Sequence, residues 1–122
     1  MSRLSNNGKS NQMAFGQFGS MHSAATANAV VAPAGRVIVA ITFLADTTVD
    51  ALVAEDPNNC INTATASQGR HSVDGANVDG SGGTTIAAGT CVFPKGLTIY
   101  GRWLNIDIDA DDDAGVICYI GE

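Results

Sequence analysis

The residues best suited to chemistry in this sequence are the carboxylates that gather in Asp107–Asp113. Hard cations such as Ca²⁺ bind several oxygen ligands at once, so a dense acidic run is a natural candidate. Asp107, Asp109 and Asp111 have the spacing of the first ligands of an EF-hand loop. The sixth position of that loop requires glycine, but this sequence has Asp112 there. The acid required at the twelfth position is Cys118. An EF-hand is therefore excluded. An irregular calcium or magnesium site remains an alternative to a solvated acidic turn, which we favour, so we expect no metal and no cofactor.

Nucleophilic catalysis needs a base beside a nucleophile. His71 is the only suitable base in the β-rich part of the chain, and its surroundings, Gly69–Ser72, are typical of a loop. Neither a GxxxxGK[ST] nor a GxGxxG phosphate-binding motif is present. The sequence therefore predicts a protein without catalytic residues.

The three cysteines, Cys60, Cys91 and Cys118, have no CxxC spacing, and the chain has only two histidines. A zinc site is therefore not expected. Buried thiols are the favoured interpretation, with a Cys60–Cys91 bridge as the alternative if the protein matures outside a reducing cell.

Aromatic side chains offer one further kind of site. Tyr100, Trp103 and Tyr119 are spaced along apolar segments and can line a sugar-binding face. Aromatic residues on strands more often belong to the core, which is the reading we favour.

From Gly35 onward the pattern indicates strands separated by turns. Arg36–Leu44 is β-branched and apolar throughout, which predicts a central strand covered on both sides. In Thr48–Ala54 we expect Val49, Ala51 and Val53 to face the core. Further short strands are expected at 84–86, 90–93, 97–104 (with a bulge or close approach at Gly101) and 115–120, and an acidic loop at 106–113. Residues 36–122 are therefore predicted to form an all-β domain, a small β-sandwich or β-barrel.

Residues 1–35 differ from this domain and are expected to form an extended N-terminal arm and connector. Residues 1–20 are rich in Ser, Asn, Gln and Gly, and residues 23–32 suit either one short helix or an extended link. Large apolar side chains stand singly along the arm and are the candidate partner-binding residues: Leu4, Met13, Phe15 and Phe18. Each contributes about 1.5–3 kcal/mol when fully buried in a pocket of a partner.

Composition and charge limit the classes of partner. Charged residues make up only 15% of the 122 residues, which suits a chain partly covered by neighbours, including other copies of itself. The net charge of −6 divides into +3 over residues 1–45 and −9 over residues 46–122. No basic cluster exists to bind nucleic acid, and no apolar run is long enough to cross a membrane. No secretory signal is visible, so we expect synthesis in the cytoplasm.

Three segments resemble small virion structural proteins of tailed phages that infect marine bacteria and cyanobacteria. They are GRVIVAITFLADTTVDALVAEDP (35–57), CVFPKGLTIYGRWL (91–104) and GVICYIGE (115–122). The resemblance implies a protein located in the virion, and we expect a capsid decoration or cement protein bound to the major capsid protein. A tail, collar or fibre-base component and a carbohydrate-binding module that uses Trp103 and Tyr100 are the alternatives.

Overall fold

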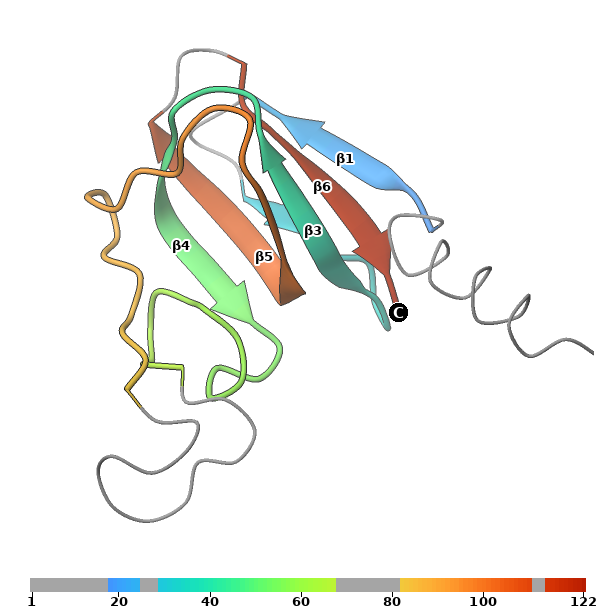
Figure 1. The fold of residues 1–122 in the computed structure, drawn as a ribbon. Helices are drawn as coiled ribbons and strands as arrows, with labels where there is room; N and C mark the ends of the chain where they lie inside the picture. The colour runs from blue at the N-terminus through green and yellow to red at the C-terminus, as the bar shows by residue number, and fades with distance from the viewer. Residues whose placement is uncertain (1–17, 25–28, 68–81, 111–113) are drawn as a thin grey trace, which may run out of the picture.

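The computed structural model describes residues 18–24, 29–67, 82–110 and 114–122, and within them the protein is all-β. One sheet joins six strands in the order β1-β6-β3-β5-β2, with β4 also paired to β5, and all neighbours are antiparallel. The sheet curves around the core like a small, nearly closed barrel (Figure 1). The predicted fold class is thus confirmed. The strands are β1 (Ser20–Ser23), β2 (Val30–Val31), β3 (Val37–Phe43), β4 (Thr48–Ala54), β5 (Thr98–Ala110) and β6 (Val116–Gly121).

The predicted central strand is β3, which lies between β6 and β5. Six of its seven residues are buried. Ile38 and Ile41 both pack in the core cluster, and such β-branched residues fit a pleated strand, which is why this segment occupies the middle of the sheet.

The longest strand, β5, has thirteen residues and connects the two halves of the sheet. Its first part runs beside β3, then the strand bends and continues beside β4 (Figure 1). A register shift against β3 lies at Gly101 and Arg102. A Cβ atom at Gly101 would lie 2.6 Å from Cys60 Sγ and 2.8 Å from the Trp103 ring, so the predicted close approach at this glycine is confirmed. Only a residue without a side chain fits the corner.

The acidic segment expected as a loop is largely the second part of β5. Ile106 and Ile108 are each 1% exposed, while Asp107 and Asp109 alternate with them. That period of two is the signature of a strand with one buried face. The prediction of a loop from residue 106 was therefore wrong up to Ala110; residues 111–113 lie outside the described part.

Two other local predictions are corrected. On β4, Leu52 and Ala54 face the core while Ala51 and Val53 are half-buried, because the register against β5 shifts at Asp50 and reverses the alternation after Val49. The expected strands at 84–86 and 90–93 are loop, apart from one bridge between Phe93 and Thr47.

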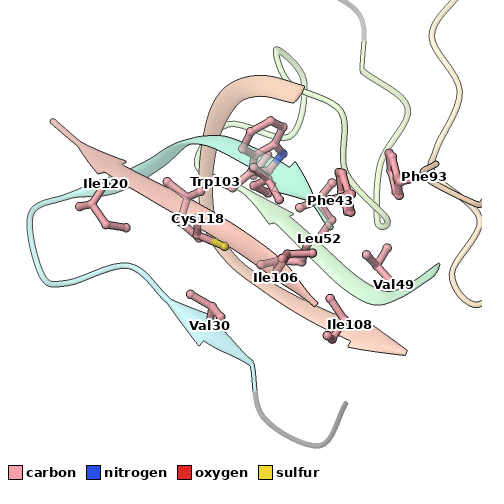
Figure 2. Packing of buried hydrophobic residues seen from close by; sticks show 14 residues of the cluster. Val30, Phe43, Val49, Leu52, Phe93, Trp103, Ile106, Ile108, Cys118 and Ile120 are labelled. Atoms are coloured by element: carbon pink, nitrogen blue, oxygen red, sulfur yellow. The ribbon is translucent and has the colours of Figure 1, made fainter. Parts of the chain in front are cut away.

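The core is one cluster to which five of the six strands contribute (Figure 2). Trp103 is fully buried and donates its indole N–H to the carbonyl of Ile61 at 2.8 Å. The rings of Phe43 and Phe93 stack with centroids 4.6 Å apart, which fastens the 82–97 segment to β3. Such pairs add about 0.5–1.5 kcal/mol beyond the burial of their area.

The sheet begins inside the segment expected as arm and connector. β1 pairs with β6 and β2 pairs with β5, so residues 20–23 and 30–31 belong to the folded domain. Polar residues in β1 hide this from the sequence: the strand reads SMHS. Its attachment depends on Gly115, which has a φ of +79° and lies against the Ser23 carbonyl.

Replacing Gly115 by Ala is expected to destabilise the protein more than replacing Gly96 by Ala. Both glycines have positive φ, which costs an L-residue about 1–2 kcal/mol, but only at Gly115 would the new Cβ collide with the Ser23 backbone. Urea unfolding of both variants measures the difference. Equal losses would show that the contact between β1 and Gly115 is unimportant for stability.

Candidate interaction surface

The structure describes one of the four predicted partner-binding residues. Leu4, Met13 and Phe15 lie outside the described residues. Phe18 packs half-buried against the chain's own core cluster, and the Arg36 guanidinium lies 4.0 Å from the centre of its ring. Phe18 therefore ties the start of the described chain to the domain.

Two of the candidate sites for chemistry fall largely outside the described part of the chain, which includes neither His71 nor Asp111–Asp113. Among the residues that the structure does describe, no group of three His, Cys, Asp or Glu side chains is placed to hold a metal ion. Nor do these residues form a helix of the length and apolar character needed to cross a membrane.

The cysteines are free thiols in this structure, without the alternative Cys60–Cys91 bridge. Cys118 is buried on β6, and burial raises the pKa of its thiol to about 12. Burial also raises the pKa of Cys60, which lies half-buried at the β5 corner. Both environments disfavour the reactive thiolate.

Trp103 cannot serve as a sugar platform, because none of its side chain is exposed. This overturns the version of the carbohydrate-binding alternative that depends on Trp103. Tyr100, on the same strand, is 66% exposed and faces away from the core.

Strand register places the outward side chains of four strands in two rows. One row runs Ser20, Tyr119, Ala40, Tyr100 and the next runs His22, Ile117, Thr42, Thr98. Directly opposed residues of antiparallel strands share a face of the sheet. We call these eight residues the tyrosine face. None of them is Asp, Glu, Lys or Arg.

The middle of the tyrosine face is hollowed. A depression of about 260 Å³ is lined by Ala40, Thr42, Thr98, Tyr100 and Tyr119. The small side chain of Ala40, between the two tyrosines in its row, leaves this space. The hydroxyl oxygens of Thr42 and Thr98 lie 2.9 Å apart and share a hydrogen bond across β3 and β5. Such a surface offers apolar contact area together with hydroxyl groups.

Three carboxylates gather on a different part of the sheet from the tyrosine face. On β4 and the second part of β5, Asp50 lies near Asp109 and Asp107, and repulsion from Asp109, followed by burial and by Asp107, raises the pKa of Asp50. The hydroxyl of Thr48 donates to Asp109 Oδ2 at 3.5 Å. We call this region, Asp50, Asp107 and Asp109, the acidic face.

One ion pair stabilises the β5 corner. Arg102 Nε lies 2.7 Å from Glu55 Oε1, and a second nitrogen of the same guanidinium donates to the backbone carbonyl of Glu122 at 2.7 Å. The hydrogen bond from Arg102 lowers the pKa of Glu55. The corner is thereby linked to the end of β4 and to the residue after β6.

Removing charge from the two sites is expected to have opposite effects on stability. The pKa of Asp50 is raised in the folded protein, so its stabilising contribution is present at acidic pH and is lost as pH rises through that pKa. At pH 7 the ionised side chain is repelled by its acidic neighbours, and Asp50→Asn should therefore stabilise the protein. The folded pKa of Glu55 is lowered, so its contribution is present at neutral pH and is lost as pH falls; Glu55→Gln should destabilise it at pH 7.

Urea unfolding at pH 7 and at a pH below the ordinary carboxyl range, about 3, measures both effects. The two differences from wild type should shrink at the lower pH. A destabilising Asp50→Asn at pH 7 would contradict the repulsion assigned to the acidic face.

The chain was compared with protein families, curated proteins and solved structures. No family model, no curated protein and no solved structure matches this chain.

Proposed function

We propose that this chain is a non-enzymatic assembly subunit: a decoration or cement protein that binds the major capsid protein lattice of a tailed-phage head. The observation that carries the proposal is the tyrosine face, a surface over four strands without a charged Asp, Glu, Lys or Arg on a chain of net charge −6. Centres of protein interfaces are depleted in charge and enriched in tyrosine.

The segments that resemble phage virion proteins coincide with this surface. They supply six of its eight residues: Ala40 and Thr42 from 35–57, Thr98 and Tyr100 from 91–104, and Ile117 and Tyr119 from 115–122. The likeness therefore covers positions on the outer side of the sheet as well as core positions, which supports an interaction role for the face.

The first described residues of the chain lead into the same surface. Residues 1–17 lead into Phe18, which packs next to Arg36, and Ser20 then enters the row of Tyr119. Leu4, Met13 and Phe15 would be the anchors of this arm on a neighbouring subunit. An arm and a face that engage one lattice together bind more tightly than either alone, because the first contact raises the effective concentration of the second.

Copy number in purified particles tests the proposal. Quantitative mass spectrometry against the major capsid protein should give a ratio near one or a simple fraction such as one third, as a symmetric lattice requires. A handful of copies per particle would assign the chain to the tail, collar or fibre base instead, and absence from particles would overturn an assembly role in the virion.

A pair of variants connects that copy number to the tyrosine face. Tyr100→Ser should lower binding to particles about tenfold to a hundredfold, the usual range for an interface tyrosine near the centre of a contact. Val92→Ser is the matched control, because Val92 is similarly exposed (56%) but lies in a loop outside the face. Equal losses for both variants would contradict the role of the face.

A further inference from the structure

The outer side of β1 is an edge of the sheet that the described chain leaves open. The outer edge of β4 is covered by loops, since Thr63 N–H donates to the Leu52 carbonyl at 3.0 Å and Gly89 N–H donates to the Val49 carbonyl at 2.8 Å. β1 and the two-residue strand β2 lie at the two ends of the strand order, and β1 pairs only with β6. Within the described ranges, no residue hydrogen-bonds the outer backbone groups of Ser20 or His22.

Hydrogen bonding identifies the backbone groups on that open side. The Gly19 carbonyl accepts from Ile120 N–H at 2.9 Å, so Gly19 and, two residues on, Met21 direct their backbone groups toward β6. Alternation in an antiparallel ladder then turns the N–H and C=O groups of Ser20 and His22 outward. The open edge thus presents two donors and two acceptors at ladder spacing.

Apart from its short length of four residues, this edge strand lacks the usual protection against pairing. Monomeric proteins block open edges with lysine, proline, inward-pointing charges or bulges. β1 reads Ser-Met-His-Ser, and its pairing with β6 proceeds without a shift in register. The absence of carboxylates also matters, because two copies that each carry −6 repel one another least where neither presents an acid.

We propose that β1 pairs with β1 of a second copy of this chain, antiparallel about a two-fold axis at Met21. Ser20 then faces His22 of the second copy, and the outward groups of these two residues exchange hydrogen bonds on both sides of the axis. Met21 faces its own counterpart in a non-hydrogen-bonded pair. Because Met21 packs against the core and Ser20 and His22 belong to the outer rows, this register matches inner positions with inner and outer with outer.

The consequence is one continuous sheet over two copies, with the two tyrosine faces joined on the same side. This deepens the proposed assembly function by naming the edge through which copies meet. Its biological purpose rests on that function, but the dimer itself is a property of the purified protein and is tested without particles.

Sedimentation velocity over a range of protein concentrations tests the pairing. Wild type should shift from 12.5 kDa toward twice that mass. Ser20→Pro removes one outward N–H from each copy, and we expect the dimer dissociation constant to rise about tenfold or more. Ser20→Ala keeps the N–H and is the matched control, with dimerisation unchanged. A wild type that stays monomeric throughout, or a dimer unaffected by Ser20→Pro, overturns the proposal.

Cross-linking tests the register. In a chain with Cys60 and Cys91 replaced by Ser, and with Cys118, the partner of Met21 on β6, replaced by Ala, Met21→Cys should form a disulfide-linked dimer on mild oxidation. Non-hydrogen-bonded partners have Cα atoms about 4.5 Å apart, which a disulfide can span. Ser20→Cys is the control, because in this register Ser20 faces His22 of the second copy rather than itself. Cross-linking at Ser20 in place of Met21 would overturn the register; near-UV circular dichroism of the buried Trp103 verifies that both variants fold.

The outcomes separate this inference from the proposed function. If the wild type forms no dimer in solution but is present in particles at the expected copy number, the β1 pairing alone is rejected. A dimer with no copies in particles rejects the virion role alone. A dimer that survives Ser20→Pro but is lost in Tyr100→Ser would place the contact on the tyrosine face and overturn edge pairing.

Discussion

The bend of β5 at Gly101 is the constraint on which the rest of the structure depends. A single strand can pair with β3 in its first part and with β4 and β2 in its second only if it turns between them. The turn brings Cys60 Sγ and the Trp103 ring so close that no Cβ fits at residue 101. Trp103 follows directly on the inner side, where its indole N–H bonds the Ile61 carbonyl and fastens the 55–67 loop under the corner. The packing of the core and the bend of the strand therefore depend on the same contacts.

The same corner separates the electrostatic character of the two parts of the sheet. Before it, β5 contributes Thr98 and Tyr100 to a surface without carboxylates; after it, β5 contributes Asp107 and Asp109. Arg102 stands between them and is paired with Glu55. The repulsion that raises the pKa of Asp50 is confined to the acidic side. A chain with this division can bury one side against neighbours without desolvating a charge, while the other side keeps the assembly soluble.

Local composition was enough to predict the fold class and β3, because a run such as VIVAITF is compatible with little besides a covered strand. Features set by pairing were not predictable. The extra residue at Asp50 reverses the alternation of β4, and nothing in its sequence marks that shift. In β5 the alternation of Ile106 and Ile108 with acidic residues is the pattern of a strand, but the density of acids led to the prediction of a loop. The tyrosine face required the register of four strands that are distant in sequence, so its residues were visible only singly.

Hydrogen–deuterium exchange on the full chain, free and bound to particles, tests most directly whether the protein meets its neighbours through the tyrosine-face side. Slower exchange in the bound state should appear in β1, β6 and the 98–100 part of β5, while β4 and the 106–109 part of β5 exchange as in the free protein. Slower exchange confined to β4 and the acidic face would contradict this assignment of the two sides.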